Sequence, residues 1–279
     1  MERSSWWTTE ISDISPGVIR LRGYPVEDLI RTTSFPGMVW LMTRGDLPTP
    51  EQARLLERAL VAGVDHGPQA PSIAIARMAM TCGVDINNAM ASATNVLGDV
   101  HGGAGQQLME LLDGVVTELA GSDDEATLRA AVAARLRAIT AAGRYVPGFG
   151  HRFHPVDPRR DPLVEAVAHA RDQGVVAGRH LAVGLEIERQ LAEGRTRAVP
   201  MNIDGATAII YAELGFAPTL GRALFVLSRS VGALAHAWEE SGSGMRNKGP
   251  EHRTILPAYT GHPPRRATAG GDQTDEEPT

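Results

Sequence analysis

Apolar residues recur every three or four positions along most of this sequence and alternate with polar residues almost nowhere. That spacing places apolar side chains on one face of a helix. Segment 49–64 shows it most fully, because Thr49, Pro50 and Gln52 form a capped helix start ahead of an apolar stripe. We expect further helices over 86–98, 104–120, 122–139, 162–174, 179–194, 205–215 and 219–241. The sequence therefore predicts an all-α fold.

Two finer predictions concern the ends of elements. Near the N-terminus, "WWTTEI" (6–11) and "GVIRLRG" (17–23) have strand-like composition and are expected to pair as a short β-hairpin across 12–16. Before the helix at 122–139, Ser122 stands three residues ahead of Glu125, which predicts a capping box with Ser122 as N-cap.

Composition excludes several classes of function. The chain has 279 residues, 27 Lys and Arg against 33 Asp and Glu, and a net charge of −6, which argues against a nucleic-acid surface. No long apolar run and no basic leader precede the helices, so we expect a cytoplasmic protein without a membrane span. The single Cys82 lies in an apolar helical pattern and is expected to be buried and inert. The polar segment 262–279 is expected to be a disordered tail.

His101 lies in "GDVHGGAG", directly before a glycine-rich turn and a helix. The positive end of a helix disfavours the imidazolium, and a neutral histidine can donate an N–H to a developing oxyanion. The alternative is a polar cap with glycines that permit close packing. An esterase oxyanion loop is excluded, because no G-x-S-x-G nucleophile motif is present.

The loop "VPGFGHRFHPVDPRRDP" (146–162) first suggests a metal site, since His151, His154 and Asp157 lie within seven residues. Metal sites with such spacing usually lie on a helix, which Pro155 and Pro158 prevent here. Glycines in the loop allow close approach of a ligand, and its arginines can hold a carboxylate or phosphate. An anionic ligand therefore fits better than a metal, while a solvated proline-rich connector stays open.

Asp204 stands at the entry to the apolar helix that follows "NIDG". Asp is among the commonest N-cap residues, so the local pattern alone indicates a cap.

Taken together, five segments resemble the citrate synthase superfamily in their order and spacing, from about residue 8 to residue 261: "SPGVIRLRGYPVEDLI", "DVHGGAG", "PGFGHRFHPVDPR", "NIDG" and "LFVLSRSVGALAHAWEE". Within it, "VDHGPQAPS" and the glycine of "NIDG" are most similar to citryl-CoA lyase, including the lyase module of ATP-citrate lyase. The resemblance implies a dimer-forming fold with a large domain (1–111 and 222–261), a small domain (112–221) and an active site between them.

The resemblance also implies roles for the candidate residues. A carbon–carbon bond beside a thioester is made or broken through an enolate, which needs a donor at its oxygen and an acid or base at its carbon. His101 matches the donor and Asp204 the acid or base, while His151 takes the proton of the tertiary hydroxyl. The resemblance assigns coenzyme A binding to the loop residues Pro147, Gly148, Phe149, Gly150 and Arg152.

The resemblance also implies that the carboxylates of the substrate are bound by His66, Arg159 and Arg229. Two departures from synthases stand out: Gly63 replaces a histidine three residues before His66, and Leu256 replaces an arginine near the C-terminus. We therefore expect a lyase that cleaves citryl-CoA to acetyl-CoA and oxaloacetate. The alternatives are a condensing enzyme that joins an acyl-CoA to an oxo acid, and a non-catalytic acyl-CoA-binding protein.

The expected partners are the substrates and a second copy of the chain. The coenzyme A thioester enters as substrate, and neither a bound cofactor nor a metal is expected. A homodimer is expected, with a tetramer as a further possibility, because 224–240 is apolar on more than one face. A partner subunit would then be able to complete the site through residues such as Arg246 or Lys248.

Overall fold

The computed structural model describes residues 6–263 apart from 123, 152, 153, 197, 253, 256 and 257. A small antiparallel sheet, β1 (Ser12–Ser15), β2 (Val18–Leu21) and β3 (Tyr24–Pro25), precedes the helices. The helices are α1 (Val26–Thr32), α2 (Phe35–Arg44), α3 (Pro50–Gly63), α4 (Pro71–Thr81), α5 (Ile86–Asn95), α6 (Ala104–Leu119), α7 (Glu125–Ala141), α8 (Arg160–Asp172), α9 (Arg179–Ala192), α10 (Ile203–Glu213) and α11 (Pro218–Ser241). The all-α prediction is confirmed.

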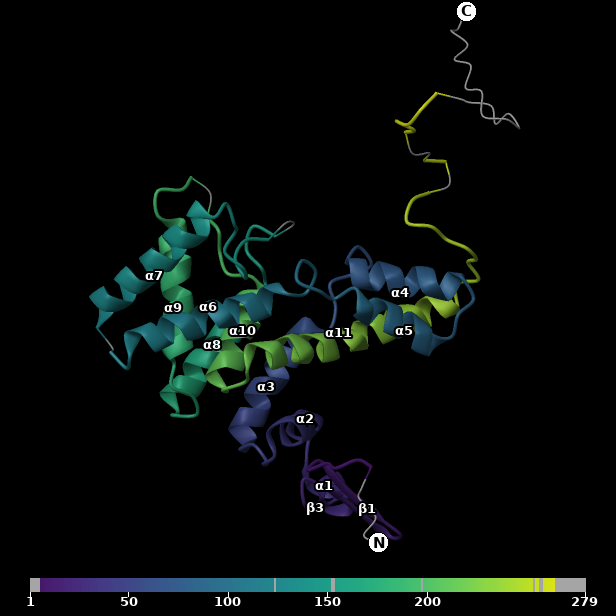
Figure 1. Ribbon diagram of the computed structural model, residues 1–279, viewed down its shortest axis with the longest axis horizontal. Coiled ribbons are helices and arrows are strands. Elements are labelled where there is room, and N and C mark those ends of the chain that lie inside the picture. The colour runs from purple at the N-terminus through teal and green to yellow at the C-terminus, as the bar shows by residue number, and fades with distance from the viewer. Residues whose placement is uncertain are drawn as a thin grey trace, which may run out of the picture.

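Helix α10 lies at the centre of the larger core. Its residues from Gly205 to Ala212 are all buried, and it packs against α3, α6, α8 and α9. A helix that is apolar on every side is typical of a core position. Figure 1 shows α11 running from this group toward α4 and α5, so one long helix connects the two ends of the molecule. The residues at the start of α10 are therefore held from several sides.

The contact of α4 and α5 with α11 is built from small side chains. Ala76, Ala93 and Ala233 are buried there beside Ile73. Small residues let helix axes approach closely, which leaves little room for larger side chains. The expected burial of Cys82 is wrong, because α4 ends before it and the cysteine is exposed.

The capping predictions had different outcomes. The Thr49 side chain accepts from the Gln52 N–H, and the Gln52 side chain accepts from the Thr49 N–H, so the predicted capping box is present. The prediction of Ser122 as N-cap of α7 is wrong. Asp124 is the cap, because its carboxylate accepts from both the N–H and the hydroxyl of Thr127.

The predicted hairpin is present, but its first strand lies elsewhere. β1 is Ser12–Ser15 rather than 6–11, and Ser15 pairs with Val18 across a two-residue turn at Pro16 and Gly17. Proline followed by a glycine of positive φ, here +75°, closes such a turn within two residues, so the connection is shorter than expected. The segment 264–279 lies outside the described residues, so the expected tail is not assessed.

No helix within the described ranges has the length and apolar character needed to cross a membrane.

Candidate active site

The loop predicted to bind a ligand is fastened to the start of α10. The Asn202 N–H donates to the Gly148 carbonyl (3.0 Å), and the Gly150 N–H donates to the Pro200 carbonyl (2.7 Å). Gly148 and Gly205 touch, since a Cβ on Gly205 would lie 2.4 Å from the Gly148 oxygen. Glycine is therefore required at position 205. Because Gly148 and Gly150 make these bonds, the backbone N–H and C=O of Phe149 face away from Met201, its partner in an antiparallel bridge.

Asp204 is not the cap of α10. Asn202 is the N-cap, and its side-chain oxygen accepts from the N–H groups of Asp204 and Gly205 at 2.9 and 3.2 Å. Among the described residues, none donates a hydrogen bond to the Asp204 carboxylate. Burial raises the pKa of Asp204, and the charges of Arg229 and Arg159 oppose that rise. A carboxyl group with a raised pKa and no structural hydrogen bond suits proton transfer.

His101 precedes α6, as predicted, and is oriented by a residue that the sequence analysis missed. The Ser72 N–H donates to His101 Nε2 at 3.1 Å, and the Ser72 hydroxyl lies 3.0 Å from the same atom. Nε2 is therefore an acceptor, so the neutral ring carries its proton on Nδ1. Burial lowers the pKa of His101, and the charge of Arg229 lowers it further. The imidazole is neutral at pH 7 with one N–H to donate.

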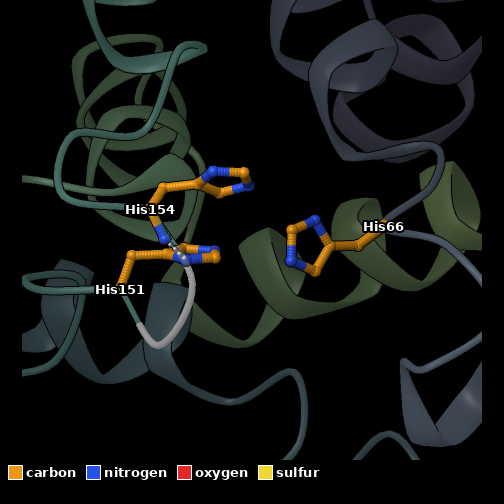
Figure 2. Close-up of side chains that lie close together, drawn as sticks. All are labelled: His66, His151 and His154. Atoms are coloured by element: carbon orange, nitrogen blue, oxygen red, sulfur yellow. Dashed lines mark hydrogen bonds between the residues drawn. The ribbon is translucent and has the colours of Figure 1, made fainter.

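Two histidines of this loop, His151 and His154, lie beside a third from a distant part of the chain, His66. Figure 2 shows His66, which follows α3, directed toward His151 and His154. The ring centroid of His66 lies 5.1 Å from that of His151 and 6.0 Å from that of His154. Burial lowers the pKa of His66, as do the charges of Arg159 and Arg229. Burial also lowers the pKa of His151, although Asp157 opposes it.

The same cluster allows a direct test of metal binding. One ligand atom from each of the three histidines lies within 4.8 Å of the others. The His154 N–H, however, donates to Nδ1 of His151 at 3.0 Å, so the neutral His151 ring carries its proton on Nε2. A metal at Nε2 needs that proton on Nδ1, where it would oppose the His154 N–H. The donor set therefore fits an oxygen acceptor better than a metal ion.

Arg159 and Asp157 form a two-point ion pair in the loop. Nε and Nη2 of Arg159 each donate to the Asp157 carboxylate at 2.9 Å. Asp157 is 1 % exposed and also accepts from the N–H of Ile203, the first residue of α10, at 3.0 Å. Burial alone would raise the pKa of Asp157, but these hydrogen bonds and the charge of Arg159 lower it to about 2.

Arg229 lies within reach of the other candidate residues. It is 5 % exposed, stacks over Phe225 and, within the described part of the chain, donates only to the Gly63 carbonyl, through Nε at 3.0 Å. Burial lowers the pKa of Arg229, while Asp65 and Asp204 oppose that change. The remaining N–H groups of a buried guanidinium are suited to hold a carboxylate. A Cβ on Gly63 would lie 2.7 Å from the Ser228 hydroxyl, so any larger residue there would require Ser228 to move.

The structure therefore brings together most of the residues chosen from the sequence. The charge of Arg229 shifts the pKa of His66, His101 and Asp204, and the charge of Arg159 shifts the pKa of His66 and Asp204. Gly148, Phe149 and Gly150 form the wall beside α10, with Pro147 before them, whereas Arg152 and Leu256 lie outside the described residues. Sequence reasoning missed Ser72 and Asn202. Asn202 had a signal, since Asn is as good an N-cap as Asp, but Ser72 had none.

Chemically, the arrangement offers two neutral N–H donors, one carboxyl group of raised pKa and two arginines in a single region. Donors of this kind stabilise negative charge on oxygen, and the carboxyl group can exchange a proton with carbon. The arginines can hold an acidic substrate.

Comparison with known proteins agrees with this description. The family model described as citrate synthase, C-terminal domain, matches residues 48–248, more than half of the chain. The structure of citryl-CoA lyase from Hydrogenobacter thermophilus has a TM-score of 0.80 and 28 % identity, over 95 % of this chain and 98 % of that one. ATP citrate lyase from Methanothrix soehngenii, in complex with citrate and coenzyme A, has a TM-score of 0.77 at 20 % identity, over 94 % of this chain and 43 % of that one, and shows the fold alone.

A citrate synthase of Deinococcus radiodurans is 30 % identical over 223 residues, which cover 78 % of this chain and 54 % of that protein. The chain spans about half the length of the curated relatives it matches. Fold, motif order and family model agree, and the chain belongs to the citrate synthase family.

Proposed function

We propose that this protein is a carbon–carbon lyase that cleaves citryl-CoA to acetyl-CoA and oxaloacetate through a thioester enolate. The observation that carries the proposal is the arrangement of neutral His101 and of Asp204, with its raised pKa, around the charge of Arg229. An enolate needs an N–H donor at its oxygen and an acid at its carbon, and these two residues supply them.

In this mechanism the tertiary hydroxyl of citryl-CoA loses its proton to His151 as the carbon–carbon bond breaks. The bonding electrons move onto the thioester oxygen, where Nδ1–H of His101 holds the enolate. Asp204, in its protonated form, then donates to the enolate carbon to give acetyl-CoA. In the structure Nδ1 of His151 accepts from the His154 N–H, so His151 can take this proton at Nε2 only after that contact has broken and the ring proton has moved to Nδ1. Condensation is the same path in reverse.

Substrate binding follows from the same geometry. Arg159 and Arg229 hold the carboxylates of the oxaloacetate part, and His66 lies beside them. The coenzyme A part binds along Pro147, Gly148, Phe149 and Gly150, where the outward backbone groups of Phe149 are suited to hydrogen bonding. Citrate and coenzyme A are ligands of the structurally similar ATP citrate lyase. No further cofactor takes part in the proposed chemistry.

A citrate synthase-type condensing enzyme is the second candidate, favoured by the names of the curated relatives. Against it, Gly63 stands where synthases, by the resemblance, carry an additional histidine. The likeness to citryl-CoA lyase also extends over nearly the whole of both chains. These two points favour the lyase. A non-catalytic acyl-CoA-binding protein is the third candidate function.

We further propose a homodimer that uses α11. Leu227, Val231, Leu234 and Trp238 are 37, 55, 43 and 72 % exposed, and their spacing places them along one stripe of the helix. A row of exposed apolar side chains is typical of an interface. The exposed segment after α11, with Arg246 and Lys248, would then reach a partner's site.

The division into domains 1–111 with 222–261 and 112–221 is likewise a proposal. Both boundaries fall inside helices, within α6 and α11. Movement of the small domain would therefore require these helices to bend or turn as units.

The deciding experiment incubates the protein with citryl-CoA, and separately with acetyl-CoA and oxaloacetate, and follows all products by mass. We expect acetyl-CoA and oxaloacetate from the first incubation. Citrate from the second incubation at a higher rate would favour the condensing enzyme. Binding of both thioesters without turnover would favour the non-catalytic protein.

A further inference from the structure

Asp157 has no role in the proposed chemistry, yet it connects two parts of the site. Its carboxylate accepts four hydrogen bonds: from N, Nε and Nη2 of Arg159 at 3.0, 2.9 and 2.9 Å, and from the Ile203 N–H at 3.0 Å. Ile203 directly precedes Asp204 at the start of α10. One buried carboxylate therefore holds both the arginine assigned to the substrate carboxylate and the helix end assigned to proton transfer.

We infer that Asp157 is a positioning residue that orients Arg159 toward the oxaloacetate part of the substrate and fixes it relative to Asp204. The inference rests on the proposed function, because it takes Arg159 as the carboxylate ligand. Asp157 itself touches no reacting atom in this scheme.

The geometry of the guanidinium supports a specific orientation. Arginine has two pairs of parallel N–H groups, one along Nε and Nη2 and one at the end, along Nη1 and Nη2. Asp157 occupies the first pair, which leaves the end of the guanidinium for a substrate carboxylate. Because Asp157 also accepts from the Ile203 N–H, the Nη1 and Nη2 groups of Arg159 are held in one position relative to α10. A free arginine would sample many rotamers before binding.

The test is Asp157→Asn, which keeps the shape and an acceptor for Ile203 but removes the charge and the two-point hold on Arg159. We expect the dissociation constant of oxaloacetate, measured by calorimetry, to rise about ten- to a hundredfold, the range for a lost hydrogen bond to a charged group. KM for citryl-CoA should rise in parallel, kcat should change less, and coenzyme A affinity should stay at the parent's value.

Glu188→Gln is the matched control. Glu188 also pairs with an arginine, Arg160 at the start of α8, and accepts from a backbone N–H, that of Met201 at 2.7 Å, but among the described residues it has no hydrogen bond to Arg159 or to α10. Its substitution should cost stability and leave oxaloacetate affinity unchanged. Equal loss of oxaloacetate affinity in both variants would mean general loosening of the loop and would overturn the inference, as would parent-like affinity in Asp157→Asn.

Removing one member of a buried pair can prevent folding, because it leaves a buried charge unpaired. In that case the double variant Asp157→Asn/Arg159→Gln, which leaves no such charge, is compared with Arg160→Gln/Glu188→Gln, which removes the neighbouring ion pair. We expect weak oxaloacetate binding in the first and parent-like binding in the second, since the Asp157–Arg159 pair holds the substrate carboxylate. Parent-like binding in the first, or an equal loss in both, would overturn the inference. A parent protein that neither binds oxaloacetate nor cleaves citryl-CoA would instead overturn the proposed function and this inference with it.

Discussion

The backbone N–H of Ser72 donates to Nε2 of His101 at 3.1 Å, and this contact decides which proton the imidazole can offer. With Nε2 occupied, the neutral ring donates only through Nδ1. His151 shows the reverse case, because its Nδ1 accepts from the His154 N–H and its proton lies on Nε2. Backbone donors thus set the tautomer of both histidines that the mechanism uses.

Asp204→Asn should abolish turnover while folding and coenzyme A binding remain. A positioned acid or base contributes about 10²–10⁴-fold in rate. Because Asn202 caps α10, the substitution removes no cap and the melting temperature should change little. Steady-state kinetics and thermal melts check this, with Asp161→Asn, in the first turn of α8, as the control. A variant that keeps the parent's kcat would rule out the proton-transfer role.

Arg229→Lys should lower kcat/KM for citryl-CoA about ten- to a hundredfold, which is the effect of losing one hydrogen bond to a charged group. Lysine keeps the positive charge but lacks the two parallel N–H groups with which a guanidinium holds a carboxylate. Coenzyme A affinity should not change. Arg222→Lys, on the same helix and paired with Asp99, serves as the control. If Arg229→Lys cleaves citryl-CoA as well as the parent, Arg229 does not hold a substrate carboxylate.

Activity and stability should both fall in acid. The pKa values of His66, His101 and His151 all lie below the usual 6.5, chiefly through burial. Above pH 6.5 these rings are neutral in the folded and unfolded states, so they add no pH dependence there. As the pH falls below that value the unfolded chain takes up protons first, which favours unfolding until the lowered pKa is passed. Melts and kcat/KM measured against pH test this, and the acid loss in kcat/KM should precede global unfolding.

Chelation should leave the reaction unaffected. His151 carries its proton on Nε2, so a metal ion at that atom would have to displace the proton and the ring's contact with the His154 N–H. Rates of citryl-CoA cleavage before and after dialysis against EDTA test this. A loss of activity that Zn²⁺ restores would contradict the tautomer assigned to His151.

Val231→Asp with Leu234→Asp should convert a dimer into a monomer, because two charges would enter an apolar interface. Light scattering at micromolar concentration measures the mass. Ile30→Asp, at an exposed apolar position on α1 away from this stripe, should leave the dimer intact. A monomeric parent would remove the proposed interface on α11.

The sequence alone determined what depends on neighbouring residues. Helical periodicity predicted the fold class, and Thr49 with Gln52 predicted the start of α3, because a capping box is a contact within four residues. Local signals predicted the wrong N-cap where two possible capping residues lie within a few positions of each other. Asp124 rather than Ser122 caps α7, and Asn202 rather than Asp204 caps α10.

Only the tertiary structure decided how the site residues act. The residue types and motif order identified His101, His151 and Asp204, but their states depend on contacts distant in sequence. Ser72 reaches His101 across 29 positions, and Asp157 reaches Ile203 across 46. Hydrogen-bond partners set the tautomers, and burial sets the directions of the pKa shifts. The hydrogen bonds and the burial both arise from the packing of helices that are distant in sequence. A sequence pattern specifies which groups are present, whereas the fold specifies which proton each of them can give.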